Sequence, residues 1–448
     1  MNTFINQLVH QLGFWASWLL IPILFEIIPT LWHSFRTNYS RILNQPLSTP
    51  KKLPMISIIL PVYNSEETLF DCIESIVNNT YPKNLIQMTI VNNNSHDNSF
   101  SEFGRAQVAF PNALLQWIDA DQGKAKALNS AIYNSVGQYI INLDTDGILQ
   151  PDALRNLVLY FENNPDIDAA AGAVLTNKKM IQATKRWSTR VLRVNEYFEY
   201  LQACMFGRSM ESAKNQLFTM SGAFSAFKRE TLVSTYMYNV DTVGEDTDMT
   251  FQIRERLGKK VGFCYNAIFY VEPIGGVSEL YTQRQRWQRG QVDVSSDFLA
   301  EDMHIGNFFK NFMVSRLMVD HTFLFPRLIW TIGLFVLVFY GYSAVLILAS
   351  FVLMYLLYVL FSILIYWQFT RMLIDFKQEK KYLKLKWWVV LTLPLYNMIV
   401  SIIRFIGIIN MITNSATWRT NNFTNELKVI KQIILDDLSR FKKGKTDD

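Results

Sequence analysis

The chain has 448 residues, of which 50% are hydrophobic and 14% aromatic, and its net charge is a modest +5. The length favours two or more structural units, and the composition is too apolar for an ordinary soluble protein and too polar for membrane helices alone, so we expect a soluble domain joined to a membrane part. Three cysteines without a CxxC spacing exclude a disulfide framework and a cysteine-based zinc site.

Residues 1–45 are predicted to form a membrane anchor. The apolar stretch from Leu12 to Trp32 is about as long as the roughly 20 residues that cross a bilayer. Arg36 and Arg41 follow it closely. Because basic residues favour the cytoplasmic side of a membrane, we expect the N-terminus outside and the next segment in the cytoplasm.

Apolar runs alternate with longer amphipathic segments over residues 54–300. The runs ISIILPVY, MTIVNNN and QYIINLD are short and rich in β-branched residues, which is typical of buried strands. This alternation predicts an α/β domain with a mostly parallel sheet. Ligands of such sheets bind beyond the carboxyl ends of the strands, so the residues after each run are candidates for a site.

A glycine and a lysine, Gly123 and Lys124, open a predicted helix in the stretch GKAKALN. The glycine allows close approach of the backbone to an anionic ligand, and the lysine adds a positive charge there. The spacing is not that of a P-loop. The ordinary chemistry of a helix N-terminus explains the pair equally well.

Two carboxylates, Asp144 and Asp146, follow the third run in the sequence LDTDG. Like charges one residue apart are costly to hold together unless a cation neutralises them, and hard oxygen ligands suit Mg²⁺ or Mn²⁺. A metal held there could bridge a diphosphate. An ordinary acidic turn at a strand end is the alternative.

Three acids gather in the stretch GEDTD, at Glu245, Asp246 and Asp248. A carboxylate near a metal and a diphosphate is a candidate general base, since it can take the proton of an attacking hydroxyl. Acids at a helix N-terminus are also favoured by the helix dipole alone, and both interpretations can hold together.

The stretch QRQRWQRG, residues 283–290, places three arginines and a tryptophan just before the most apolar third of the chain. A basic run of this kind is commonly a solvated face. A site for an anionic ligand is the other interpretation, and this stretch alone does not decide between them.

The C-terminal third is predicted to meet the membrane. Residues 301–327 contain amphipathic spacing typical of interfacial helices, although packing on the soluble domain is the alternative. Residues 328–413 are predicted to form about three transmembrane helices with a basic cytoplasmic loop near 370–386, and a turn is expected near Gly341. Residues 414–448 form an amphipathic basic tail, for which anionic lipids rather than nucleic acid are the expected partners.

Seven motifs resemble, in order, those of a known family. They are PVYNSEETL, SHD, GKAKALN, LDTDG, SGAFSAFKRE, GEDTD and QRQRW. This order resembles the membrane-integrated, inverting family 2 glycosyltransferases, which include hyaluronan, chitin, cellulose and poly-N-acetylglucosamine synthases. The likeness covers about residues 56–290 and implies a GT-A-like fold for the cytoplasmic domain. The short layout also resembles glycosyltransferases that accompany exosortase-like systems in Gram-positive bacteria.

The resemblance implies roles for individual residues, which fall into donor, metal, acceptor and catalytic groups. On the donor side are Pro61, Tyr63, Glu66, Asn92, Asn93, Lys124 and Asp144, with Asp144 and Asp146 holding the metal. The acceptor and diphosphate group is Ser221, Gly222, Glu245, Gln283, Arg286 and Trp287. Asp246 is similar to the catalytic base in the family's Thr-Glu-Asp triplet, and Gly244 replaces the threonine.

One departure from the family concerns the nucleotide base. The family usually has two acids in the strand-end turn where this chain has Asn92 and Asn93. An asparagine carbonyl still accepts a hydrogen bond from uracil N3–H, but the charge-assisted bond is lost. We expect UDP as the nucleotide, bound without the charge-assisted hydrogen bond to uracil that other family members form.

The sequence thus predicts a membrane-bound inverting glycosyltransferase that adds sugars from a nucleotide-sugar to a growing polysaccharide. Transfer of a single sugar to a lipid carrier or lipid-linked glycan is the first alternative, and a non-catalytic nucleotide-binding membrane scaffold is the second. Expected partners are the nucleotide-sugar, a glycan or glycolipid acceptor and membrane lipids, but no nucleic acid. A partner subunit or a second copy of the chain could complete an export path.

Overall fold

The computed structural model describes most of the predicted soluble domain and much of the apolar C-terminal third. Residues 1–45 except for 23–28 and 32, residues 301–323 and residues 414–448 lie outside the described part, and so do the predictions of an anchor, interfacial helices and a basic tail. The described residues are 23–28, 32, 48–299, 324–341, 343–373 and 376–413.

An eight-stranded mixed sheet forms the centre of the domain, in the order β3-β2-β1-β4-β7-β6-β8-β5. Strands β1, β2, β3 and β4 pair in parallel, as do β6 and β8, whereas β7 and β5 pair antiparallel to their neighbours. The α/β fold predicted from the alternating pattern is confirmed. The strands are β1 Ile56–Val62, β2 Ile86–Asn92, β3 Leu114–Asp119, β4 Tyr139–Leu143, β5 Gly147–Leu149, β6 Ile167–Thr176, β7 Phe224–Lys228 and β8 Lys260–Val271.

Strand β1 shows why these segments become central strands. Every one of its seven residues is buried, because helices cover both faces of a parallel sheet and the strand must be apolar on both sides. Helix α3, Leu69–Val77, buries Leu69, Cys72, Ile73 and Ile76 in the same core, and these residues share one face at helical spacing. The carboxyl ends of β1, β2 and β4 therefore lie at one edge of the sheet.

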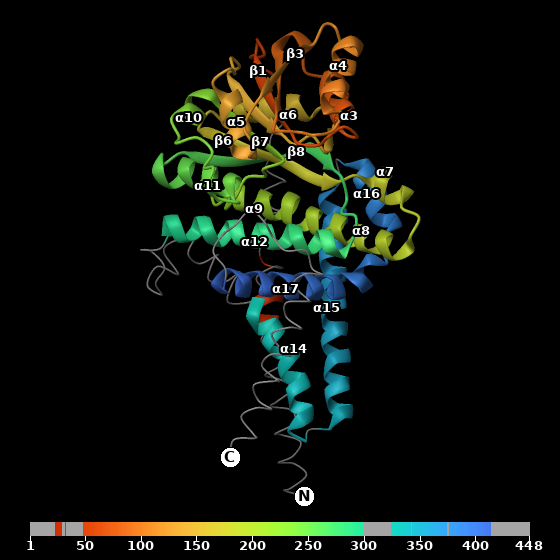
Figure 1. The fold of residues 1–448 in the computed structure, drawn as a ribbon. Helices are drawn as coiled ribbons and strands as arrows, with labels where there is room; N and C mark the ends of the chain where they lie inside the picture. Colours follow the sequence, from red (N-terminus) through yellow and green to blue (C-terminus); the bar gives the residue numbers. More distant parts are fainter. Residues whose placement is uncertain are drawn as a thin grey trace, which may run out of the picture.

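Short helices connect the strands and pack on the sheet. They are α3, η2 Lys83–Leu85, α4 Ser99–Ala109, α5 Lys124–Ile132, α6 Ala153–Asn163, α7 Lys178–Ala183, α10 Arg229–Val233, α11 Glu245–Phe251 and η4 Gln252–Arg256. Beneath the sheet lies a second group of long helices (Figure 1). It consists of α8 Trp187–Tyr200, which continues as η3 Leu201–Gly207 and α9 Arg208–Ala213, together with α12 Val277–Leu299.

The apolar third of the chain forms two arms below these helices. Helices α14, Leu324–Phe339, and α15, Ala344–Met372, extend away from the domain, whereas α17, Val389–Thr413, lies crosswise to α15 and along α12 (Figure 1). By length and composition, Ala344–Arg371 and Val389–Asn410 are candidate membrane spans among the described residues. The two candidates do not run side by side. A short helix, η1 Ile23–Ile27, is described near the N-terminus.

The basic loop predicted near 370–386 contains a helix, α16 Lys377–Leu385, that is attached to the domain. Its Glu379 is buried, pairs with Lys178 and accepts a hydrogen bond of 2.7 Å from the Tyr270 hydroxyl. Along α17, Arg404 donates to the Gln288 side chain of α12 at 2.8 Å, so this charge faces protein. Ion pairs and hydrogen bonds thus fix the apolar third to the sheet domain.

Candidate active site

The acidic turn after β4 and the lysine that opens α5 meet at the carboxyl edge of the sheet. Lys124 Nζ lies 2.6 Å from Asp144 Oδ1 and 3.9 Å from Glu245 Oε1. The three side chains are between 14% and 28% exposed, so the charges are partly shielded from water but remain reachable. A cation between two carboxylates at a strand end can also neutralise an incoming diphosphate.

Gly222 connects this ion pair to Asp246. Its carbonyl accepts from Lys124 Nζ at 3.2 Å and from Asn142 Nδ2 at 3.1 Å. Its N–H donates to Asp246 Oδ2 at 3.0 Å. A Cβ at this position would lie 3.2 Å from that same oxygen, so the absence of a side chain keeps one face of the carboxylate accessible. Residues separated by about a hundred positions in the sequence are thereby gathered in one cluster.

Asp246 lies in the first turn of α11 and is held there by its neighbours. Its Oδ1 accepts the Thr247 N–H at 2.7 Å, while Oδ2 accepts from Gly222. Oδ1 also accepts the Thr247 hydroxyl at 3.3 Å, so these bonds fix the carboxylate in one orientation and leave a free lone pair on Oδ2. Burial raises the pKa of the adjacent Glu245, whereas Lys124 and Arg286 act in the opposite direction, so the Arg286 charge lies within range of the cluster. The cluster therefore combines a candidate base with two cations.

The acidic turn suits a hard divalent cation. Burial, and next the charge of Asp144, raise the pKa of Asp146 to about 6, so a bound cation would favour the ionised form of this carboxylate. Within the described ranges no three His, Cys, Asp or Glu side chains converge as a closed coordination shell. Mg²⁺ and Mn²⁺ commonly use one or two carboxylates and complete their shell with water and substrate phosphate. The donor set of Asp144 and Asp146 fits that mode.

On the nucleotide side, the asparagines that replace the family's acids are already engaged. Asn92 donates to Asp119 Oδ1 at 2.8 Å and accepts from the Ser95 N–H at 2.9 Å. Asn93 accepts from the N–H of Gly123, whose φ of +135° is one that favours glycine. Asn93 therefore fixes the start of the Lys124 helix. Asp119 supplies an exposed carboxylate at this edge and was not among the residues predicted from the sequence.

The remaining predicted donor residues occupy the end of β1. Pro61 is buried within the strand, whereas Tyr63 is 49% exposed beyond it. Glu66 is also exposed, and its carboxylate accepts the Asn98 N–H at 3.0 Å at the start of α4. Tyr63 and Glu66 thus lie at the predicted edge of the sheet, but Pro61 presents no side chain there.

Helix α12 carries the Gln-x-x-Arg-Trp residues. Trp287 is 40% exposed, and its ring centroid lies 6.1 Å from that of Tyr200. Gln283 accepts a hydrogen bond from the neighbouring Arg284, which is only 3% exposed. Arg286 is exposed, and its charge lowers the pKa of Glu245. One helix therefore presents both an exposed cation and an exposed aromatic ring.

Close contact between two glycines positions this helix against the loop that precedes α11. A Cβ added to Gly244 would lie 2.8 Å from both the Cα and the carbonyl oxygen of Gly290, and a Cβ on Gly290 would lie 2.8 Å from Gly244 Cα. The backbones of α12 and of the α11 N-cap therefore touch. Ser221, one residue before Gly222, is buried beside the same loop. The glycine that replaces the family's threonine is thus required by packing.

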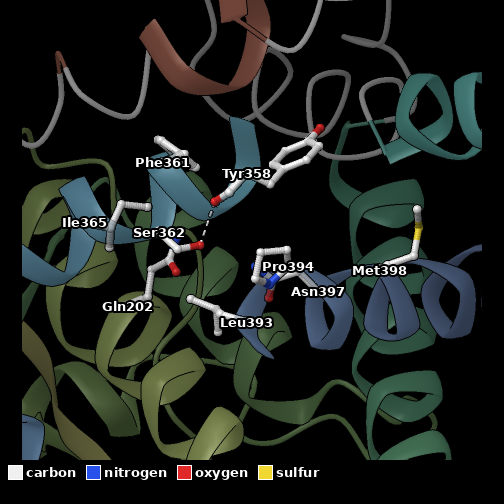
Figure 2. Close-up of a pocket in the computed structure, with 9 residues that line it drawn as sticks. All are labelled: Gln202, Tyr358, Phe361, Ser362, Ile365, Leu393, Pro394, Asn397 and Met398. Atoms are coloured by element: carbon white, nitrogen blue, oxygen red, sulfur yellow. Dashed lines mark hydrogen bonds between the residues drawn. The ribbon is translucent and has the colours of Figure 1, made fainter. Parts of the chain in front are cut away.

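Figure 2 shows a cavity between α15, α17 and η3. Its lining combines aromatic and aliphatic side chains with amides and a hydroxyl. The residues are Gln202, Tyr358, Phe361, Ser362, Ile365, Leu393, Pro394, Asn397 and Met398.

Comparisons with known proteins agree with this arrangement. Residues 57–233 match the family described as Glycosyl transferase family 2. The Probable glycosyltransferase YdaM of Bacillus subtilis is 28% identical over 255 residues, which are 56% of this chain and 58% of that protein. The Poly-beta-1,6-N-acetyl-D-glucosamine synthase of Staphylococcus epidermidis is 27% identical over 249 residues, 53% of this chain and 55% of that protein. The chain thus spans a little over half of each relative.

Among solved structures, the fold is similar to that of the mannosyltransferase PcManGT from Pyrobaculum calidifontis in complex with GDP-Man and Mn²⁺. The TM-score is 0.57 at 16% sequence identity, and the match covers 87% of this chain and 98% of that chain. The predicted GT-A-like fold is confirmed. The prediction that the chain is an enzyme of the glycosyltransferase class is confirmed as well.

Proposed function

We propose that this chain, whose residues 57–233 match the family described as Glycosyl transferase family 2, is a membrane-bound inverting transferase that adds sugars from a UDP-sugar to a growing polysaccharide. The proposal rests on the two hydrogen bonds of the Gly222 backbone, one to Asp246 and one from Lys124. Together with the ion pair of Lys124 and Asp144, they place Asp246 in one cluster with these two residues. A general base and the groups that receive a diphosphate are the two parts that inverting sugar transfer requires.

In the proposed reaction, Asp246 removes the proton from an acceptor hydroxyl as that oxygen bonds to the anomeric carbon. The bond from this carbon to the diphosphate oxygen breaks on the opposite face, and the nucleoside diphosphate departs with the electron pair. Lys124 and Arg286 stabilise the charge that develops on the diphosphate. Asp144 and Asp146 would hold Mg²⁺ or Mn²⁺, which supplies further charge neutralisation when bound. The direct displacement inverts the anomeric configuration.

The proposed nucleotide is UDP, recognised with help from Asp119. The side-chain amide of Asn92 is fixed between Asp119 and Ser95, so its carbonyl oxygen retains one free lone pair. Asp119 accepts from Asn92 and from Trp117 through Oδ1, and its Oδ2 can accept the imide N–H of uracil. A carboxylate in reach of the base restores the charge-assisted bond that the asparagines alone cannot form.

The proposed membrane location and polymeric product are supported by the apolar helices and by the names of the relatives, not by the geometry of the site. Two candidate spans among the described residues and relatives named as polysaccharide synthases support a catalytic domain held in the cytoplasm at the cell membrane. Export through a partner subunit or a second copy, and association with exosortase-like systems, stay predictions. Transfer of a single sugar to a lipid carrier would give one discrete product instead of a ladder.

Release of nucleoside diphosphate by the full-length protein in detergent tests the proposal. UDP-sugars and GDP-mannose are supplied with Mn²⁺, and products are separated by size. We compare Asp246→Asn with Asp241→Asn, the same chemical change at an exposed residue of the preceding loop. Turnover by the wild type and Asp241→Asn but not by Asp246→Asn supports the assignment. Nucleotide binding without turnover by the wild type would instead indicate a scaffold.

A further inference from the structure

Between α8, α12 and α17 lies a charged cluster whose arginine is buried and whose glutamate is partly buried, and the Gln-x-x-Arg-Trp pattern assigns no role to it. Arg284 occupies the second position of QRQRW and is 3% exposed. Its guanidinium forms a two-point ion pair with Glu199 of α8, with Nε donating to Oε1 at 3.1 Å and Nη2 to Oε2. The Tyr396 hydroxyl of α17 donates to the same Glu199 oxygen. We call Glu199, Arg284 and Tyr396 the clamp.

The clamp contacts two residues of the Gln-x-x-Arg-Trp pattern directly. Arg284 Nη1 donates to Gln283 Oε1. The Arg284 guanidinium carbon lies 4.2 Å from the ring centroid of Trp287, at cation–π distance, and 5.9 Å from that of Tyr200. One face of the indole is therefore backed by a cation that Glu199 holds in place. Since Trp287 remains 40% exposed, part of the ring is open to a ligand.

Burying an arginine has a high desolvation cost, and apolar side chains of similar volume would often stabilise the fold as well. The geometry offers a use for this charge, because a planar guanidinium with a bidentate partner has little freedom to rotate. Such a group can fix the rotamers of the two side chains that it touches. Precise support of this kind matters where a sugar must be held for reaction.

We propose that Arg284 is a positioning residue that sets Gln283 and Trp287 for the acceptor sugar, and that Tyr396 makes α17 part of this support. The proposal rests on the proposed function. Two further bonds join α17 to the same helix, from Gln285 Nε2 to the Ile403 carbonyl at 3.1 Å and from Arg404 to Gln288. The acceptor side of the site is thus completed by a helix from the apolar third of the chain.

The test uses full-length Arg284→Lys and Tyr396→Phe, with Arg289→Lys on the same helix as the matched control. We expect Arg284→Lys to raise the acceptor KM about tenfold and Tyr396→Phe about threefold, because a loosened cation–π and hydrogen-bond support weakens binding of the acceptor. Release of nucleotide to water and the donor KM should change by less than about twofold in each variant. Arg289→Lys should match the wild type.

A second readout does not require turnover. The Trp287 contribution to fluorescence is taken as the difference between each protein and its Trp287→Phe counterpart, and acrylamide quenching of this contribution is measured. Greater quenching in Arg284→Lys and Tyr396→Phe, at an unchanged Tm for Tyr396→Phe, supports the proposal. Unchanged quenching, or equal losses of hydrolysis and acceptor transfer, would overturn it. A wild type that releases no nucleotide refutes the proposed function but leaves the quenching result decisive for the clamp.

Discussion

Restoring the family's threonine at position 244 should damage this protein. The backbone contact between Gly244 and Gly290 leaves no room for a side chain, since a Cβ would lie 2.8 Å from two backbone atoms of α12. Ordinary contacts begin at 3.4 Å. The N-cap of α11 and helix α12 would have to separate by about 0.6 Å for alanine and by more for threonine.

The cost follows from what the two elements carry. Overpacking of this kind destabilises a fold by about 1–3 kcal/mol. The separation would also move Asp246 relative to Arg286 and Trp287, and misplacement by about 1 Å can lower a rate by about a hundredfold. We therefore expect Gly244→Ala to lose at least about tenfold in transfer rate and several degrees in Tm, with larger losses for Gly244→Thr.

Transfer rate and thermal unfolding of the detergent-solubilised protein provide the assay. Gly104→Ala is the control, because this glycine lies within helix α4 and a Cβ there meets no atom within 4 Å. Alanine should leave the Tm unchanged or raise it, given its better helix propensity. If Gly244→Thr retained the wild-type rate and Tm, the packing argument would be refuted.

Three further predictions follow from the site and its surroundings. Asp246→Asn should lower transfer by about 10²- to 10⁴-fold while nucleotide-sugar binding persists, as measured by turnover and calorimetry; equal loss of binding would contradict its role as a base. Asp119→Asn should raise the KM for UDP-sugars more than the catalytic rate falls, and an unchanged KM would remove it from base recognition. Burial raises the pKa of Glu196 from 4.5 to about 8, so the folded protein keeps a proton that the unfolded chain releases. The free energy of unfolding should therefore fall by about 1.4 kcal/mol per pH unit as the pH rises from the unfolded pKa to the folded one. In denaturation curves at pH 6 to 8, Glu196→Gln should reduce this dependence of the unfolding free energy on pH. The same dependence in the variant and the wild type would be inconsistent with the burial of Glu196.

Much of the sheet and its edge could be predicted because the signal is local. The runs that became β1, β2 and β4 are continuous and apolar, and the polar residues after them, such as Asp144 and Asn93, lie where parallel strands end. Asp119 was missed because its strand, LLQWID, lies at the sheet edge and is only partly buried. That strand lacks the continuous apolar run by which its neighbours could be recognised.

The clamp could not be predicted, for a different reason. Arg284 stands at an unassigned position of a motif, and its partners Glu199 and Tyr396 lie 85 and 112 residues away in the sequence. No pattern of spacing indicates an ion pair across three helices. The position of α17 across α15 and along α12 could not be predicted from the sequence either. Composition does not distinguish an apolar helix that spans a membrane from one that packs along another helix.

The contact between α17 and α12 matters for experiments on the sheet domain alone, because removing α17 changes the surface of α12. A fragment that ended near residue 300 would retain the acids, Lys124 and the nucleotide edge, yet it would expose the Gln285 and Gln288 side chains that α17 now covers. Gly407 also packs against Gln285 and would be lost. Such a fragment is expected to hydrolyse the nucleotide-sugar but to bind the acceptor weakly. Detergents for the intact protein should therefore be chosen by whether they preserve the contact between α12 and α17.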